Sequence, residues 1–383
     1  MSIFLLVLSL FTLLATLILT DQVVRGFASL EALKEIPPIY GDLPRVSLIV
    51  AARNEERHIE QALQSLLRID YEPLEITVVN DRSTDSTGKI LRRMASENTH
   101  LQLVEIDALP PEWLGKNHAL HCGAARAHGD WVLFTDADIV FEPLAIRRAI
   151  QYVTRYQVDH LCLTPDTRMP TWLLQSFVVV FSLMFHIFIQ TWRVSDPNSR
   201  AHVGIGAFNL VRRDVYQAIQ GHELIAMRPD DDVKLGKVIK DRGYRQRILN
   251  GVGEIRVEWY NSLRELIVGL EKNSYAILGY NPLATVASVT TLLLLTVWPF
   301  VAILATTGIT RWLNLIIAGL WLLQCAVSGV MLNAPLTTVA MFPVSIVLFS
   351  YIQVRSMWIT LRTGGIRWRD TFYPLAALKA NRV

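Results

Sequence analysis

Long apolar runs and short alternating segments divide the chain into two kinds of structure. Residues 2–20 form about nineteen uncharged residues, enough to cross a bilayer at a rise of about 1.5 Å per residue. Three further apolar runs cover residues 284–306, 312–332 and 335–354. We predict that all four are membrane helices. The first is predicted to be a retained anchor, because no basic segment precedes it and no Ala-x-Ala motif follows it.

Between the first and second runs, short β-rich segments alternate with segments of helical periodicity. The predicted strands are apolar and rich in β-branched residues; they are residues 45–52, 74–80, 101–106 and 131–135. Residues 59–67 place apolar side chains at i, i+3, i+4, i+7 and i+8, which predicts a helix, and a second helix is predicted over 84–96. This alternation predicts a doubly wound α/β domain with a mostly parallel sheet and a ligand site at the carboxyl ends of its strands.

Composition supports one globular domain together with a membrane portion. The 383 residues are 51% hydrophobic, and the net charge of +3 is too small and scattered to indicate a nucleic-acid partner. The three cysteines, Cys122, Cys162 and Cys325, have neither metal-binding spacing nor an even number, which fits a reducing, cytosolic environment.

Asp136 and Asp138 end the apolar run that starts at Trp131. Because they are two residues apart, their side chains leave the strand on the same side. Together they can hold a hard divalent cation that keeps positions for phosphate oxygens. The alternative is an ordinary strand-to-loop junction, since Asp-x-Asp is a common sequence.

Other polar residues follow predicted strands or precede predicted helices. Asp81 ends a buried strand and can accept hydrogen bonds from a nucleobase or ribose, whereas Ser83, Thr84 and Asp85 are suited to capping the next helix. Lys116 is either a solvated surface charge or a ligand for a diphosphate. His118 and His121 lie three residues apart, but no further ligand completes a zinc site, and none is predicted.

Residues 230–232 are three consecutive aspartates at a predicted helix start. A helix N-terminus favours acidic residues, which accounts for one or two of them. Crowded carboxylates raise the proton affinity of at least one member, as a general base for an alcohol requires. The triplet is therefore a candidate catalytic base site.

The ordered set of these motifs resembles the family 2 inverting glycosyltransferases over residues 44–250. The motifs are Asn54-Glu55, Asn80-Asp81-x-Ser83-Thr84-Asp85, Gly115-Lys116, Asp136-x-Asp138, Gly206-Ala207-Phe208, Asp231-Asp232 and Gly243-Tyr244-Arg245. The resemblance implies a GT-A (Rossmann-like) catalytic domain with added transmembrane α-helices. The leading and trailing spans are similar to the lipid-modifying branch, including the hopanoid-associated and carotenoid glycosyltransferases.

The resemblance also implies roles for individual residues. Asn54, Glu55 and Asp81 would bind the nucleoside, and Lys116 would lie near the diphosphate of a UDP- or GDP-sugar. Asp136 and Asp138 would hold Mg²⁺ or Mn²⁺, with Asp138 the direct ligand. Asp232 would be the base, with Asp231 beside it. The chain departs from the family by having Asp231 where Glu is usual and Asn80 where many members have Asp.

The acceptor side is expected near Gly206 and Phe208, and near an apolar stretch, residues 172–192, that has Trp172 and Trp192 at its ends. That stretch is either a core helix or, as we favour, an interfacial helix beside the acceptor entrance. The predicted reaction transfers a sugar with inversion to the hydroxyl of a membrane lipid. The alternatives are a polyprenyl-phosphate sugar synthase, a polysaccharide synthase, which the absence of Gln-x-x-Arg-Trp disfavours, and a binding protein on an inactive scaffold.

The predicted organisation has five parts: an anchor (1–21), the GT-A domain (40–255), an interfacial segment (256–283), transmembrane helices (284–358) and a basic tail (359–383). Nucleotide sugars require the domain to face the cytosol from the inner membrane. Three full trailing spans would then place the tail outside. The positive-inside rule favours a cytosolic tail instead, because its basic residues outnumber the single acid Asp370; they are Arg355, Arg362, Arg367, Arg369, Lys379 and Arg382. Either one trailing segment, most plausibly 335–354, re-enters on the same side, or the tail lies outside.

Overall fold

The computed structural model describes residues 2–381 and residue 383, and the chain divides into two compact units. We call the first the sheet unit; it comprises Leu30–Thr167, Arg193–Glu258 and Ala380–Val383. We call the second the helical unit; it comprises Met1–Ser29, Arg168–Trp192 and Trp259–Lys379. Residues 1 and 382, and with Arg382 one member of the basic tail, lie outside the described residues.

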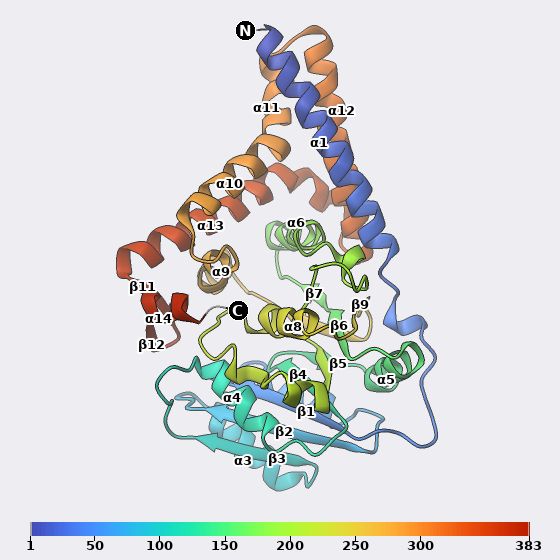
Figure 1. Cartoon of the computed structure of the whole chain (residues 1–383), viewed down its shortest axis with the longest axis vertical. Helices are drawn as coiled ribbons and strands as arrows, with labels where there is room; N and C mark the ends of the chain where they lie inside the picture. The colour runs from blue at the N-terminus through green and yellow to red at the C-terminus, as the bar shows by residue number, and fades with distance from the viewer. Residues whose placement is uncertain (1, 382) are drawn as a thin grey trace. The chain divides into compact units, whose positions relative to one another are not determined.

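The sheet unit is built on seven strands in the order β3-β2-β1-β4-β8-β6-β9 (Figure 1). Their bounds are β1 Val46–Ala52, β2 Leu74–Asp81, β3 Leu101–Ile106, β4 Trp131–Asp136, β6 His160–Thr164, β8 Asn209–Arg212 and β9 Gln246–Asn250. Strand β8 pairs antiparallel with β4 and β6, and the other pairs are parallel. The prediction of a mostly parallel α/β sheet is confirmed, and all four strands predicted from sequence are present to within one residue at each end.

The register brings the predicted strand ends to one edge of the sheet. Ala51 of β1 lies opposite Asp136, and Ala52 lies opposite Asn80. The polar residues that follow β1, β2 and β4 therefore share the edge where ligands bind in such sheets. A short β5, Val140–Phe141, continues from this edge and pairs antiparallel with β10, Ile255–Glu258.

Helices cover both faces of the seven-stranded sheet. One face packs against α2 Ile59–Leu66, α3 Thr87–Glu97 and α5 Ala145–Tyr156, through buried residues that include Leu63, Leu91 and Ile146. The other face packs against α4 Gly115–Ala124, α7 Arg213–Ala218 and α8 Asp231–Asp241, through residues that include Leu120 and Leu235. Two 3-10 turns, η1 Leu33–Glu35 and η3 Gly221–Glu223, complete the unit. This is the two-sided packing of a doubly wound fold.

The predicted helix over 84–96 begins three residues later than expected, at Thr87. The backbone N–H of Thr84 donates instead to Oδ1 of Asn54, at 2.8 Å, so this residue belongs to the loop at the sheet edge. Asp85 accepts a hydrogen bond from the Thr87 N–H at 2.9 Å, which confirms its predicted capping role.

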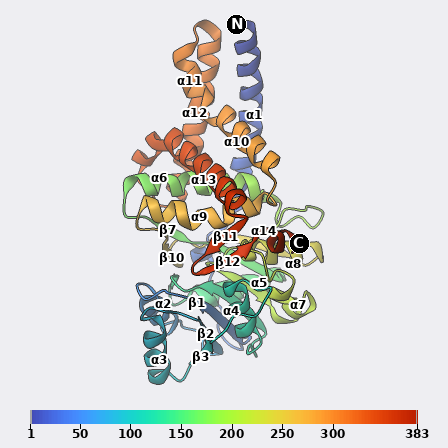
Figure 2. The ribbon, with the colours of Figure 1, turned by 90° about the vertical axis from the view of Figure 1, so that its left-hand side faces the viewer.

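The helical unit contains the predicted membrane runs and several further elements. Their bounds are α1 Ser2–Ala28, α6 Trp172–Ile189, α9 Leu263–Ile277, α10 Pro282–Thr296, α11 Trp298–Ala305, α12 Gly308–Met331 and α13 Phe342–Thr363. Smaller elements are β7 Asp166–Arg168, η2 Thr191–Arg193, η4 Leu336–Met341, β11 Gly365–Trp368, β12 Thr371–Pro374 and α14 Leu375–Ala380, of which β7, η2 and α14 reach across the boundary between the units. Helices α6 and α9 both contact α13 (Figure 2), and their buried residues Leu174, Phe177, Leu266 and Leu270 share one cluster with Ile352 of α13.

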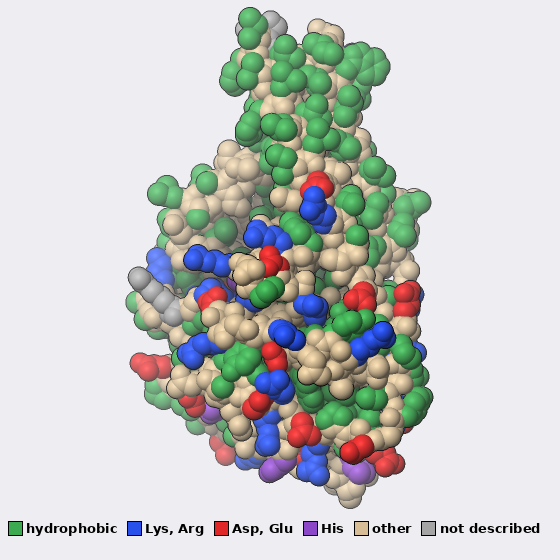
Figure 3. All heavy atoms as spheres, turned by 45° about the vertical axis from the view of Figure 1, so that its right-hand side comes forward, with side chains coloured by type: hydrophobic (Ala, Val, Ile, Leu, Met, Phe, Trp, Pro, Cys, Tyr) green, Lys and Arg blue, Asp and Glu red, His purple; other side chains and the backbone are tan. Residues whose placement is uncertain are grey.

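Helices α1 and α12 run parallel and are joined by polar side chains. The Asn314 amide donates to the Ser9 hydroxyl at 2.8 Å, and the Gln324 amide donates to the Thr20 hydroxyl at 2.9 Å. Such hydrogen bonds link helices in a membrane, where apolar packing alone gives little preference. The face of α1, α11 and α12 shown in Figure 3 is covered by hydrophobic side chains.

Four helical segments are long and apolar enough to cross a membrane. They are Ile3–Ala28, Trp172–Arg193, Gly308–Met331 and Leu336–Thr363. The pair α9 and α10, bent by 113°, would make a fifth as a broken span.

The prediction of a single helix over 284–306 is wrong, because the helix is interrupted at Val297, between α10 and α11. Pro299 provides the physical reason: it has no N–H, and its ring clashes with the carbonyl four residues earlier. That carbonyl belongs to Leu295, and it accepts a hydrogen bond from the indole N–H of Trp321 at 2.9 Å. A side chain from α12 thus replaces the lost helical bond.

The start of α8 crosses the segment 203–206 at backbone contact. A Cβ on Gly236 would lie 1.7 Å from the Val203 carbonyl oxygen, and one on Gly204 would lie 1.7 Å from the Asp232 carbonyl oxygen. Neither obstacle is a movable side chain, so both positions require glycine. This crossing fixes the helix that carries the acidic residues.

We expect Gly236→Ala to destabilise the protein by about 3 kcal/mol or more, because the added methyl group must displace backbone. Gly319→Ala is the matched control, since that helical glycine has open space where its Cβ would lie. The melting temperature of the purified protein in detergent measures both. Equal melting temperatures for the two variants would contradict the close crossing.

Candidate functional site

The acidic pair of β4 lies where the sequence predicts it, at the carboxyl end of the strand. Asp136 is the last residue of β4, and its backbone N–H donates to the Gly206 carbonyl at 3.0 Å. Asp138 follows at the edge, and burial, then the carboxylates of Asp136 and Glu55, raise its pKa to about 7. The three carboxylates thus concentrate negative charge that a cation would relieve.

Lys116 joins the acidic pair to the acidic triplet. It lies in the first turn of α4, and its Nζ is 2.8 Å from Asp136 Oδ1 and 3.3 Å from Asp231 Oδ2. Although burial lowers its pKa, the carboxylates of Asp136, Asp231 and Asp232 raise it well above the usual value. The solvated surface position considered for Lys116 does not apply, because the ammonium group is held between two acids.

The three aspartates at the start of α8 have different partners. Asp230 is buried and paired with the Arg228 guanidinium, at 2.9 Å for each of two hydrogen bonds. Asp231 is paired with Lys116. Asp232 accepts hydrogen bonds from the Gly206 N–H and the Val233 N–H, both at 2.8 Å. The triplet that the sequence presents as one cluster is therefore divided by two cations.

The proton affinity of Asp232 is raised. Burial and the neighbouring Asp231 raise its pKa to about 7, although Lys116 acts in the opposite direction. A carboxylate with a pKa near neutrality can accept a proton from a reacting group at physiological pH. The crowding argument from sequence thus applies to Asp232 in particular.

Gly206 connects the two acidic groups through its backbone. It donates to Asp232 and accepts from the Asp136 N–H. A Cβ at this position would lie 2.6 Å from Asp136 Oδ2, so a side chain does not fit while that carboxylate keeps its place. The backbone therefore approaches closely at Gly206. Phe208, also expected near the acceptor, is fully buried beside Phe141 and contributes to the core beneath the site.

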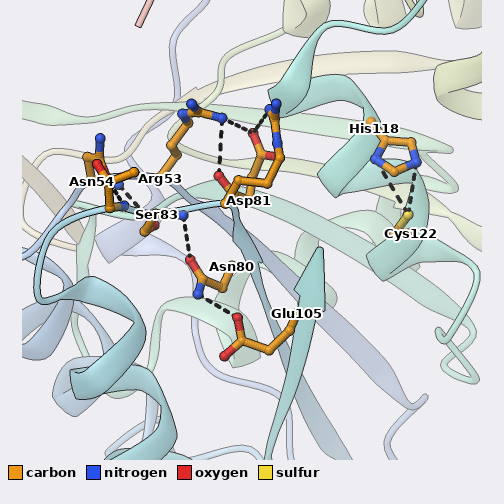
Figure 4. Close-up of polar contacts among 10 residues, drawn as sticks. Arg53, Asn54, Asn80, Asp81, Ser83, Glu105, His118 and Cys122 are labelled. Carbon is orange, nitrogen blue, oxygen red and sulfur yellow. Dashed lines mark hydrogen bonds and ion pairs between the residues drawn. The ribbon is translucent and has the colours of Figure 1, made fainter. Parts of the chain in front are cut away.

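Asp81 lies at the end of β2 and is buried, but its carboxylate already has two cationic neighbours (Figure 4). Arg82 donates to both carboxylate oxygens, at 2.7 Å and 3.0 Å, and the Arg53 guanidinium lies 3.6 Å away. Gly115 allows this arrangement, because its Cβ would lie 2.4 Å from Asp81 Oδ2. A nucleoside that uses Asp81 must share the carboxylate with these arginines or displace them.

The loop after β1 is tied to the loop after β2. Asn54 has a left-handed backbone (φ 54°); its N–H donates to the Ser83 hydroxyl at 3.1 Å, and its Oδ1 accepts from the Thr84 N–H. The adjacent Glu55 N–H donates to the Thr87 hydroxyl at 2.8 Å. Figure 4 also shows Asn80 between Ser83 and Glu105. Asn54 therefore ties the loop after β1 to the loop after β2 through its own hydrogen bonds.

The histidines of α4 make local contacts, as the sequence indicates. His118 faces Cys122, with Nε2 3.5 Å from the sulfur (Figure 4), and the ring of His121 lies beside that of Trp113. Within the described residues, no group of three or more His, Cys, Asp or Glu side chains is arranged to hold a metal ion. A cation at the β4 edge would need ligands from a bound substrate in addition to protein carboxylates.

A pocket at the sheet edge is lined by five of the predicted site residues, whereas Asn54, Glu55, Asp81, Asp138 and Phe208 do not line it. Its lining residues are Lys116, Leu120, Phe134, Thr135, Asp136, Gly206, Asn209, His222, Asp231, Asp232 and Leu235. The sequence did not single out Thr135, Asn209 or His222, which come from strands and a turn with no distinctive motif. Trp172 and Trp192 belong to the helical unit, where Trp172 begins α6 and is 47% exposed.

The doubly wound sheet with carboxylates at its carboxyl edge has the GT-A type of fold, and a solved structure shares it. The mannosyltransferase PcManGT from Pyrobaculum calidifontis, in complex with GDP-Man and Mn²⁺, is similar with a TM-score of 0.59 and 19% identity, over 91% of this chain and 99% of that chain. At this identity the likeness shows the fold alone.

Sequence comparison identifies the family of the domain. Residues 47–220 match the model of glycosyl transferase family 2, and they form a domain of that family. The 4,4'-diaponeurosporenoate glycosyltransferases of several Staphylococcus aureus strains, including USA300 and NCTC 8325, are 27% identical over 180 residues, which cover 46% of this chain. The alignment spans 46% of the length of those relatives. The predicted family and fold class are thereby confirmed.

Proposed function

We propose that this protein is an inverting glycosyltransferase that transfers a sugar from a nucleotide-sugar donor to the hydroxyl group of a membrane lipid. The observation that carries the proposal is the pocket in which Asp136 and Asp232 are joined through the backbone of Gly206. One carboxylate group is suited to the donor phosphates and their cation, and the other to the acceptor. A single base acting opposite the leaving group gives inversion.

The donor end of the proposal rests on the charge at the β4 edge. Asp136 and Asp138 are hard oxygen ligands that suit Mg²⁺ or Mn²⁺, and the raised pKa of Asp138 reflects negative charge that such a cation would balance. A bound cation would stabilise the departing diphosphate. Lys116 lies in the first turn of α4, where the helix N-terminus also favours phosphate. The fold relative solved with GDP-Man and Mn²⁺ is consistent with this assignment.

We expect Asp138→Asn to lower turnover roughly a hundredfold or more while leaving the protein folded, because the amide fills the same space but binds the cation weakly. Glu142→Gln, at an exposed position a few residues beyond the pair, is the control. Turnover with Mn²⁺, Mg²⁺ or a chelator measures the effect. Undiminished turnover in the presence of the chelator would refute the cation assignment.

The acceptor end of the proposal rests on Asp232. An alcohol is a weak acid, so its attack on the anomeric carbon requires a base that removes the hydroxyl proton. In this chain Asp232 combines a pKa near 7 with a position in the pocket, while Asp230 and Asp231 are paired with cations. An ionised acceptor, such as a lipid phosphate, needs no base. Asp232 therefore separates the proposal from its main alternative, a polyprenyl-phosphate sugar synthase.

We expect Asp232→Asn to reduce transfer to an alcohol about 10²–10⁴-fold with donor binding retained, since a general base contributes that much. Wild-type kcat/KM should rise with pH through about 7 as Asp232 loses its proton. Asp231→Asn should shift that rise to lower pH, because removing a neighbouring negative charge lowers the pKa of Asp232. If Asp231→Asn were inactive and Asp232→Asn active, Asp231 and not Asp232 would be the general base.

Lipid analysis tests the function as a whole. Membranes with wild-type protein should contain a glycosylated lipid that is absent from membranes carrying Asp138→Asn, as detected by mass spectrometry. A glycoside of an alcohol survives mild acid, whereas a glycosyl phosphate is hydrolysed, so the same sample separates the two acceptor classes. The relatives are named for diaponeurosporenoate, which is a carboxylate, so an ester-linked sugar that mild base removes would contradict the hydroxyl acceptor. Wild-type membranes without any new glycolipid would refute the proposal.

We infer the membrane topology from the route of the chain. The sheet unit is formed by three separate segments, and a compact soluble unit lies on one side of a membrane. The chain must therefore cross an even number of times within residues 168–192 and within 259–379. Helix α6 is alone in the first interval, so we assign it to the interface and not to a span, as favoured from sequence.

Residues 259–379 fit one crossing of the membrane outward and one crossing back. In this assignment α10 and α11 cross the membrane outward and α12 crosses it back. Helices α1 and α12 are parallel and so cross in the same direction, which agrees with the inward crossing assigned to α1. Helix α13 then stays on the side of the sheet unit, which nucleotide-sugar supply places in the cytosol. The basic tail would satisfy the positive-inside rule.

We expect a fluorescent reporter fused after Val383 to be active in the cytosol, and a periplasm-only reporter fused there to be inactive. The same periplasmic reporter inserted at Thr307, between α11 and α12, should be active and serves as the matched control. Periplasmic activity after Val383 would establish three full trailing spans. It would refute the inference that the chain crosses the membrane an even number of times within residues 259–379.

A further inference from the structure

The segment Leu224–Arg228 leads into the acidic triplet without belonging to a helix or strand. Within the segment the Arg228 N–H donates to the Ile225 carbonyl at 2.9 Å, and the Ile225 and Ala226 N–H groups bond back to η3 at 3.2 and 3.4 Å. The course of this segment determines where Asp231 and Asp232 begin α8. External groups must therefore hold its backbone in place.

Asn117 is the first of these groups. It is fully buried in α4, and its side-chain Nδ2 donates to the carbonyls of Ile225, Ala226 and Arg228, at 2.7, 3.2 and 2.9 Å. The Leu114 N–H adds a bond to the Ala226 carbonyl at 2.8 Å. The same turn of α4 carries Lys116, so one helix start holds both the segment and the charge of Asp231.

Asn381 is the second group, and it comes from more than 150 residues further along the chain. Its Nδ2 donates to the Leu224 carbonyl at 3.0 Å, and its Oδ1 accepts from the Met227 N–H at 3.2 Å. A side-chain amide has one donor group and one acceptor, as a peptide unit does, so it can bridge two backbone positions at once. Val383 packs nearby against the buried cluster that contains Ile225 and Leu235.

We propose that Asn381 is a positioning residue, which holds the segment Leu224–Arg228 and thereby sets the place of Asp231 and Asp232. Asn117 fixes the carbonyls on one side of the segment, and Asn381 fixes its first carbonyl and the N–H of Met227. Asn381 touches neither Asp136, Lys116 nor Asp138 by any hydrogen bond of the described residues. Its loss should therefore affect the catalytic step more than donor affinity. This part of the inference rests on the proposed function.

The test uses the full chain in detergent with three variants. Asn381→Ala removes both bonds, and Asn381→Asp keeps the acceptor but places a carboxylate against the Leu224 carbonyl. Asn98→Ala is the matched control, because that asparagine bonds the Met94 carbonyl of its own helix at 2.8 Å, outside the pocket. We call the two hydrogen bonds from Asn381 to the segment the clamp. Hydrogen–deuterium exchange over residues 224–232 measures whether the clamp holds the backbone, without reference to activity.

We expect both Asn381 variants to exchange faster over 224–232 than wild type, and Asn98→Ala to match wild type there. With the transferase assay, kcat should fall roughly ten- to a hundredfold with donor KM little changed, as small misplacements of catalytic groups cause. Wild-type exchange rates in Asn381→Ala would overturn the clamp. Faster exchange with unchanged kcat would overturn the positioning role. A wild-type protein without transferase activity would refute the proposed function, while the exchange measurement would still decide the clamp.

Discussion

The site depends on one residue, Gly206, whose backbone bonds the backbone of Asp136 and the carboxylate of Asp232. Its carbonyl accepts from the Asp136 N–H, and its N–H donates to the Asp232 carboxylate. The absence of a side chain is necessary, because Asp136 Oδ2 would lie 2.6 Å from a Cβ. The end of β4 and the start of α8 are therefore held at a fixed separation by a single residue. Hydrogen bonds through rigid backbone place catalytic groups more accurately than contacts between flexible side chains.

Charge balance is the second constraint on the pocket. Seven carboxylates approach this edge of the sheet, and the cations that face them are fixed on different elements: Arg82 beside Asp81, Arg228 beside Asp230, and Lys116 between Asp136 and Asp231. Glu55 and Asp138 share the edge, and Asp232 has hydrogen bonds in place of a close cation. The resulting pattern leaves Asp138 and Asp232 with pKa values near 7 at two ends of one site.

The sequence predicts those features that follow from local periodicity. Strands β1 to β4 and helix α2 are apolar at regular spacing, and their positions are recovered to within one residue. The edge occupied by Asp81, Asp136 and Asp138 follows from these strands because parallel strands share a direction. The break at Val297 was missed although Pro299 is visible in the sequence, since a proline in an apolar run is compatible with a kinked helix as well as with two helices.

The partner of each polar side chain is the part that sequence reasoning could not supply. No local pattern shows that Arg228 neutralises Asp230, that Arg82 occupies Asp81, or that Asn117 and Asn381 bond the same segment. Each pairing joins residues through a turn or across a large sequence separation, and many other partners were equally compatible with the chain. The sequence predicts a raised proton affinity for at least one of residues 230–232, and Asp232 has one. Which of the three acids it would be depends on where each cation lies, and the sequence does not show that.

The two ends of the site are supported in different ways, and this difference has a functional meaning. Asp136 ends a buried strand, lies opposite Ala51 of β1 and bonds the Gly206 carbonyl, so the strand end of the site is held by the sheet. Asp232 begins a helix that follows an irregular segment, and its position depends on bonds from Asn117 and Asn381. Under the proposed function, the donor diphosphate would bind at the strand end and the acceptor hydroxyl at the helix end. The division of the acids between strand and helix would then match the division between donor and acceptor.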